Sequence, residues 1–165
     1  MAGLEDLYRE IILDHYRSPR NRGELPVPPA HKVEGFNPLC GDEVVLYIEV
    51  DADTDTVTDV KIAGQGCSIS QASTSMMSSA VKGKSLDEVR QMVRAFKAMM
   101  SIHEHELDGD DEDAAEAELA NVKLGDLEAL RGVVKFPVRI KCATLAWNTL
   151  TQGLDEAEAD EARAS

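Results

Sequence analysis

The chain contains no long apolar run. None of its 165 residues falls in a stretch of 18 consecutive apolar residues, and the N-terminus has no apolar signal core. A transmembrane helix needs about 20 predominantly apolar residues, so we expect none here. We therefore expect a cytoplasmic protein. The length predicts a single domain that is large enough to bury a core.

Basic residues are also scarce. The chain has 17 Lys and Arg against 31 Asp and Glu, a formal net charge of −14. Clustered Lys and Arg are needed to neutralise nucleic-acid phosphates or to bind an anionic membrane, so the charge balance argues against both partners. Much of the negative charge is local: residues 104–118 hold nine acidic side chains and no Lys or Arg, and residues 155–165 hold five against one Arg. We expect both segments to be solvated.

Cysteine is rare as well, with three residues in the whole chain. An odd number cannot form a closed disulfide framework, and structural disulfides are uncommon in the cytoplasm. Metal binding or reactive-thiol chemistry is the interpretation that these counts favour.

Apolar periodicity and turn signals predict an α+β domain. Helical spacing and capping residues predict helices over residues 4–17, from Ser68 or Ser70 to Gly83, from Ser85 to about Ser101, at 124–130 and over 141–152. Alternation and β-branched residues predict strands at 31–36, 44–50 and 57–63, and an extended segment at 137–140. The last two strands pair through the turn at 51–55. We expect a small antiparallel sheet of about three strands, with helices packed on one face.

The domain boundaries follow from the same patterns. We expect one domain over residues 1–152, interrupted by an acidic insert at about 104–118. The acidic segment 153–165 is expected to be a disordered tail.

The three cysteines lie at element boundaries. Cys40 precedes the second strand, Cys67 follows the third, and pairing of these strands brings both to the same end of the hairpin. Cys142 falls near the start of the last helix. Together with Asp42, three thiolates and one carboxylate satisfy the tetrahedral coordination of Zn²⁺. Taken singly, each cysteine equally fits a small buried residue, and Asp42 fits a turn residue that accepts a backbone hydrogen bond. The spacing contains no CxxC pair, so both interpretations stay open.

Three longer motifs resemble a known family. "NPLCGDE" (37–43), "GQGCSISQASTSMM" (64–77) and "RIKCATLAW" (139–147) resemble the SufU family, a branch of the U-type iron–sulfur assembly proteins related to the IscU scaffolds. The resemblance spans residues 4–152. Scaffolds of the IscU type typically carry His before the third cysteine, where this chain has Lys141. The 74 residues between Cys67 and Cys142 also leave room for the extra stretch that SufU proteins hold there, although the acidic insert looks longer than the family needs.

The resemblance implies both a site and an activity. It implies Zn²⁺ bound by Cys40, Asp42, Cys67 and Cys142, with Cys40 as the persulfide acceptor. It implies a sulfurtransferase that takes sulfur from a SufS-type, PLP-dependent cysteine desulfurase and passes it to downstream Suf components of iron–sulfur cluster assembly. Two other functions use the same residues: a scaffold on which a nascent Fe–S cluster is assembled, and a zinc module with a purely structural role.

Other polar and large residues are expected to have ordinary places. All four histidines, His15, His31, His103 and His105, are expected to be solvated at the surface. Arg139 and Lys141 are expected to be exposed charges, which could meet an acidic partner. Trp147 and the methionines Met76, Met77, Met92, Met99 and Met100 are expected to pack in the core.

Overall fold

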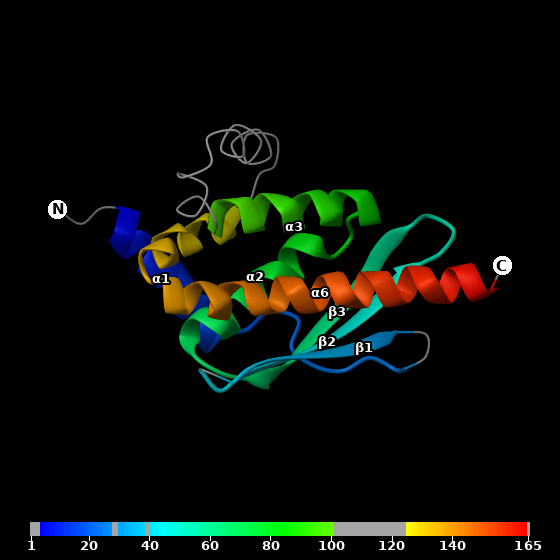
Figure 1. The fold of residues 1–165 in the computed structure, drawn as a ribbon, viewed down its shortest axis with the longest axis horizontal. Coiled ribbons are helices and arrows are strands. Elements are labelled where there is room, and N and C mark those ends of the chain that lie inside the picture. The colour runs from blue at the N-terminus through cyan, green and yellow to red at the C-terminus, as the bar shows by residue number, and fades with distance from the viewer. Residues whose placement is uncertain (1–3, 28–29, 39, 101–124, 165) are drawn as a thin grey trace.

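Helices cover one face of a three-stranded antiparallel sheet in the computed structural model, which describes residues 4–27, 30–38, 40–100 and 125–164. The elements in chain order are α1 (Leu4–Arg17), β1 (His31–Asn37), β2 (Asp42–Asp51), β3 (Thr56–Gln65), α2 (Ser68–Val81), α3 (Leu86–Met100), the 3₁₀ helix η1 (Gly125–Lys135) and α6 (Pro137–Ala164). In Figure 1, α6 runs lengthwise over the sheet. The helix α2 passes behind α6 in this view, and α3 lies on the side of α6 that is farther from the sheet. The predicted α+β fold class is confirmed.

The sheet has the order β1–β2–β3, so β2 is its central strand. Val44 pairs with Gly64 and Ile48 pairs with Val60, which confirms the predicted hairpin. At the other edge of β2, Asn37 pairs with Asp42 and closes the β1–β2 hairpin. Residues 44–48 of β2 are all buried, and Val44, Leu46 and Ile48 join the hydrophobic core.

The core is centred on Trp147 of α6, which is fully buried. Its ring stacks on Phe96 of α3 with centroids 4.6 Å apart and planes inclined by 17°. The indole Nε1 donates to Ser73 Oγ at 3.3 Å, and that hydroxyl donates to the carbonyl of Ala143 at 2.6 Å. The core position predicted for Trp147 is confirmed. The same holds for the methionines, all of which are buried: Met76, Met77, Met92, Met99 and Met100.

The N-caps of α3 and α2 were both predicted, one correctly and one not. The Glu88 backbone N–H donates to Ser85 Oγ at 3.2 Å, which confirms Ser85 as the predicted cap of α3, and Ser85 Oγ donates to Glu88 Oε1 at 3.1 Å, so the Glu88 side chain bonds the cap hydroxyl. The prediction for α2 is wrong, because its N-cap is Cys67 and not a serine. The Cys67 side chain accepts from the Ser70 backbone N–H at 3.4 Å.

The last helix is longer than predicted at its beginning. It starts at Pro137, whereas residues 137–140 were expected to be extended. Proline is favourable in the first turn of a helix, because its fixed φ suits the helix and its missing N–H would have no intrahelical partner there.

The same helix also continues beyond its predicted end at residue 152. Leu154 is fully buried and joins the hydrophobic core. Arg90 of α3 pairs with Asp155 at 2.9 Å and with Glu158 at 3.0 Å. A disordered tail from residue 153 is therefore wrong for the described residues, because a buried leucine and a basic partner on α3 hold this acidic segment against the domain.

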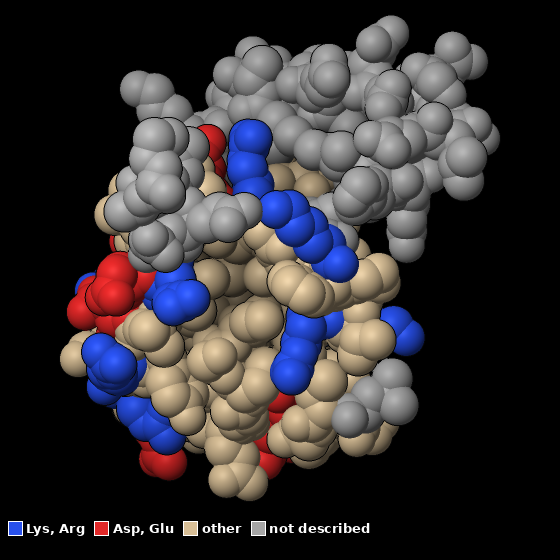
Figure 2. Space-filling view, turned by 90° about the vertical axis from the view of Figure 1, so that its left-hand side faces the viewer, with Lys and Arg blue, Asp and Glu red and all other residues tan. Residues whose placement is uncertain are grey.

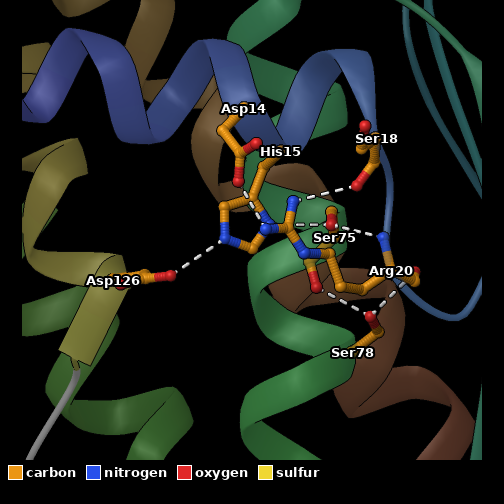
Figure 3. Close-up of polar contacts among 7 residues, drawn as sticks. All are labelled: Asp14, His15, Ser18, Arg20, Ser75, Ser78 and Asp126. Carbon is orange, nitrogen blue, oxygen red and sulfur yellow. Dashed lines mark hydrogen bonds and ion pairs between the residues drawn. The ribbon is translucent and has the colours of Figure 1, made fainter.

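His15 is buried, contrary to the predicted surface position. Its Nδ1 lies 2.8 Å from Ser75 Oγ of α2, and its Nε2 lies 3.1 Å from Asp126 Oδ2 of η1 (Figure 3). The Arg20 backbone N–H donates to the same Ser75 oxygen at 2.8 Å. His15 stands one turn beyond Ile11 on the packed face of α1, so it joins α1 to two other helices through hydrogen bonds.

Some predictions fall outside the described residues, namely the acidic insert at 104–118 and the histidines His103 and His105. His31, at the start of β1, is half-buried. Within the described ranges, no helix is both long enough and apolar enough to cross a membrane.

Truncating Leu154 tests the packed end of α6. We expect Leu154→Ala to lower the free energy of unfolding by about 2–5 kcal/mol, because the change removes a fully buried side chain and leaves a cavity. The exposed neighbour Gln152, changed to Ala, serves as the control and should alter stability by less than about 0.5 kcal/mol. Urea denaturation of both variants gives the comparison. Equal stability of the two would mean that the helix end is not packed.

Candidate metal centre

The turn between β1 and β2 carries the first candidate ligand. The Cys40 backbone N–H donates to the Asn37 carbonyl at 3.2 Å, which closes the turn. Gly41 follows with φ of +67°, a left-handed conformation that glycine adopts without steric cost. The Cys40 side chain is half-buried, so its thiol is accessible from outside the protein.

Asp42, the second candidate ligand, has a buried side chain that accepts hydrogen bonds from two other residues. Its Oδ1 accepts from the Cys67 backbone N–H at 2.9 Å, and its Oδ2 accepts from Asn37 Nδ2 at 3.4 Å. Gly66 makes this approach possible, since a Cβ at that position would lie 2.5 Å from Asp42 Oδ1. The carboxylate therefore ties the start of β2 to the segment between β3 and α2.

Cys142, in the second turn of α6, is fully buried. Asn37 Nδ2 donates to its Sγ at 3.6 Å. The donor atoms of Cys40, Asp42 and Cys142 all lie within 4.8 Å of one another. The structure thus brings three of the four predicted ligands into one group, and Cys67 borders this group through its backbone bond to Asp42.

The helix positions of the two remaining cysteines differ. Cys67 is the N-cap residue of α2. Cys142 is the sixth residue of α6, because that helix begins earlier than predicted. Cys142 therefore lies farther into its helix than predicted.

Burial and the neighbouring donors set the electrostatics of the site. Burial, followed by hydrogen bonding with Cys40, Asp42 and Cys67, raises the pKa of the Cys142 thiol well above its ordinary value. Arg139 is exposed, as predicted, and its guanidinium faces the thiols. A hydrogen bond with Cys142, followed by the charge of Cys67, raises the pKa of Arg139. A guanidinium, which stays charged, therefore lies beside the sulfur atoms of the site.

The donor set suits a zinc ion. Sulfur ligands at about 2.3 Å in a tetrahedron stand roughly 3.8 Å from one another, and the observed grouping within 4.8 Å is close to that spacing. All three cysteines are free, so none is consumed by a disulfide. Two thiols and a carboxylate converge, and a third thiol is adjacent. The residues present therefore fit a Cys₃Asp zinc site.

Asn37 is the site residue that was not singled out from the sequence. It begins the "NPLCGDE" motif, yet the motif drew attention for its cysteine and aspartate. Its amide donates to both Asp42 and Cys142, and its carbonyl accepts from Cys40. A polar side chain at the end of a strand, directly before proline, was the available signal. Its contact with Cys142 could not be foreseen, because 105 residues separate the two.

Comparison with known proteins gives matches over most of the chain. Residues 7–143 match the family described as the NifU-like N terminal domain. The zinc-dependent sulfurtransferase SufU of Bacillus subtilis is 45% identical over 157 residues, which cover 95% of each chain. The iron–sulfur cluster assembly scaffold protein IscU of Streptococcus pyogenes is 39% identical, over 93% of this chain and 86% of that protein.

A solved structure agrees with the fold. The putative iron–sulfur cluster assembly scaffold protein for the SUF system from Fervidobacterium islandicum superposes with a TM-score of 0.70 and 34% identity, covering 92% of this chain and 99% of the other. The resemblance to SufU and IscU proteins, drawn from three motifs, is confirmed.

Removing the Asn37 amide tests its role in holding the site. We expect Asn37→Leu to lower the free energy of unfolding by about 1–3 kcal/mol, because the buried Asp42 oxygen and the Cys142 sulfur lose a donor. The measurement is urea denaturation of metal-free protein, so that metal binding does not contribute. Asn148→Leu on the exposed side of α6 is the matched control and should change little. If the two variants were equally stable, Asn37 would not hold these ligands.

Proposed function

Because the chain belongs to the NifU-like N-terminal domain family, we propose that it is a zinc-dependent sulfur acceptor that works with a SufS-type cysteine desulfurase. It takes persulfide sulfur from that enzyme and passes it to the Suf components of iron–sulfur cluster assembly. The observation that carries the proposal is the convergence of Cys40, Asp42 and Cys142 within 4.8 Å. Similarity to a zinc-dependent sulfurtransferase over 95% of the chain supports it.

Cys40, Asp42, Cys67 and Cys142 would hold the zinc ion. When bound, Zn²⁺ keeps its thiol ligands deprotonated at neutral pH, which the buried Cys142 would not achieve unaided. Asn37 and the Cys67 backbone N–H hold Asp42 from two sides, so this ligand has a fixed position.

Sulfur transfer requires one thiolate to act as a nucleophile. The Cys40 thiolate attacks the outer sulfur of the desulfurase persulfide, and an S–S bond forms between these two atoms. The S–S bond of the donor persulfide breaks at the same time, and the desulfurase cysteine leaves as a thiolate. Cys40 then carries the persulfide. The outer sulfur keeps its proton, and no external oxidant or reductant is needed.

Cys40 is the acceptor because it is the ligand whose position can change most easily. It lies on a turn and is followed in the chain by Gly41, which has a positive φ, and its side chain is half-buried. Cys67 is held as the cap of α2, and Cys142 is enclosed in α6. Release of Cys40 leaves three ligands in place, and a side chain of the docked desulfurase could occupy the vacated position.

The second candidate function is the scaffold for a nascent Fe–S cluster. Similarity to an IscU scaffold over 93% of the chain favours it. Lys141 argues against it, because scaffolds of that type typically carry His immediately before the third cysteine. Iron and visible absorbance in protein purified without air would identify a scaffold. A structural zinc module, in contrast, would bind zinc and never carry a persulfide.

The first test is metal content. We expect about one Zn²⁺ per chain, measured by elemental analysis. Asp42→Ala and Cys142→Ser should each lower zinc occupancy and melting temperature together, because metal binding is coupled to folding. Ser79→Ala, an exposed change on α2, should alter neither. Metal-free protein that melts at the same temperature as the purified form would contradict a zinc site in the fold.

The second test locates the sulfur. We expect the protein to raise the turnover of a SufS-type desulfurase, and mass spectrometry to find the added sulfur on Cys40. Cys40→Ser should abolish this stimulation, while docking to the desulfurase survives because single side chains outside hot spots contribute little to an interface. A persulfide on Cys67 or Cys142 with Cys40 unmodified would overturn the assignment, as would full stimulation by Cys40→Ser.

A further inference from the structure

An apolar groove lies between α1, the start of α2 and η1. It has a volume of about 410 Å³. Tyr8 and Ile12 come from α1, Ile69 from α2 and Val133 from η1, while Phe136 lies in the link between η1 and α6. The mechanism above uses none of these residues, and the groove is open to solvent at Phe136, whose side chain is 62% exposed.

The groove adjoins the candidate metal centre. Ser68 and Ile69, which line it, directly follow Cys67 in the chain. Phe136 directly precedes α6, the helix that carries Cys142. A partner that brings a persulfide to Cys40 would therefore stand next to the groove.

Exposed apolar residues gather around the same end of the molecule. The described part of the chain has six large exposed hydrophobic residues; two of these, Phe36 and Val138, flank site residues in the sequence, and a third, Phe136, lines the groove. Phe36 precedes Asn37, and Val138 precedes Arg139. Exposed apolar side chains that cluster at one place mark an interaction surface.

The charged residues that line the groove are basic, although the chain as a whole is strongly acidic. Arg9 and Lys135 belong to the groove lining, which contains no Asp or Glu, and Arg139 and Lys141 lie near the start of α6. Figure 2 shows this end, where Lys and Arg side chains surround an uncharged centre and acidic side chains lie toward the edges of the view. The turn at 51–55 and the end of α6, both rich in acidic residues, lie at the opposite end in Figure 1.

We propose that the groove is a docking site for an apolar segment flanked by acidic side chains, carried by the desulfurase that donates the sulfur. The inference rests on the proposed function. The apolar walls suit the apolar part of such a segment, and Arg9 and Lys135 in the groove lining complement its acidic flanks. Such a contact orients the partner before transfer and is separate from the zinc ligands.

The test compares two exposed apolar residues. Phe136→Asp places a negative charge at the groove, and Val27→Asp does the same in the connector before β1. Each full-length variant is titrated against a SufS-type desulfurase, with calorimetry for binding and cysteine turnover for stimulation. We expect Phe136→Asp to raise the half-saturating concentration at least tenfold, with maximal stimulation and zinc content unchanged. Val27→Asp should match the wild type, and Phe136→Leu should restore most of the affinity.

A second variant tests the charge component. Arg9→Glu should weaken binding several-fold at low salt and make the affinity less dependent on ionic strength, because the removed interaction is screened by salt. Arg17→Glu, also exposed and on the same helix but outside the groove lining, is the matched control and should retain the salt dependence.

The outcomes separate this inference from the proposed function. If the wild type stimulates the desulfurase and Phe136→Asp does so with the same half-saturation, the docking site is wrong and the function stands. If the wild type binds without stimulation and Phe136→Asp weakens that binding, the docking site stands and sulfur acceptance is wrong. A wild type that does not bind the desulfurase overturns both. A wild-type dimer that Phe136→Asp dissociates would also overturn the proposed occupant, because the groove would then receive a second copy of this chain.

Discussion

The buried carboxylate of Asp42 is the constraint on which the geometry of the candidate site depends. A carboxylate that is removed from water must be paired or hydrogen-bonded, or it destabilises the fold. Here one oxygen accepts from the Cys67 backbone N–H and the other from the Asn37 amide. These two bonds join the ends of β1, β2 and β3 at one point. The same Asn37 amide reaches Cys142, so α6 is brought to that point as well.

This arrangement divides the ligands into fixed and movable ones. Asp42 is held by two donors, Cys142 is enclosed in a helix, and Cys67 caps another helix. Cys40 is held mainly through the backbone of its turn, with a half-buried side chain. A site that must both retain a metal and offer a nucleophile needs this asymmetry. If all four ligands were fixed in position, none of the thiols could reach a second protein. Arg139 adds a cation beside the sulfur atoms, where thiolates must form.

The parts of the structure that sequence could predict are those set by local signals. The β2–β3 hairpin, α1 and the Ser85 cap of α3 each depend on residues close together in the chain, and all three were predicted. The long α6 was not, because its acidic end is held by Arg90, 65 residues away from Asp155. His15 was misplaced because its partners Ser75 and Asp126 lie on other helices. The candidate ligands could be named from motifs, but the role of Asn37 required the tertiary contact between β1 and α6.

The most direct measurement of the central claim is X-ray absorption spectroscopy at the zinc edge of the purified protein, because it counts sulfur ligands separately from oxygen or nitrogen ligands. The account predicts three sulfur ligands at about 2.3 Å and one oxygen ligand at about 2.0–2.2 Å, the latter lost in Asp42→Ala. A count of three sulfur ligands would mean that Cys67 binds the zinc ion together with Cys40 and Cys142. It would thereby add the fourth ligand to Cys40, Asp42 and Cys142, whose donor atoms lie within 4.8 Å of one another. A shell with two sulfurs or fewer, or one that is unchanged in Asp42→Ala, would contradict the Cys₃Asp site and the division of roles built on it.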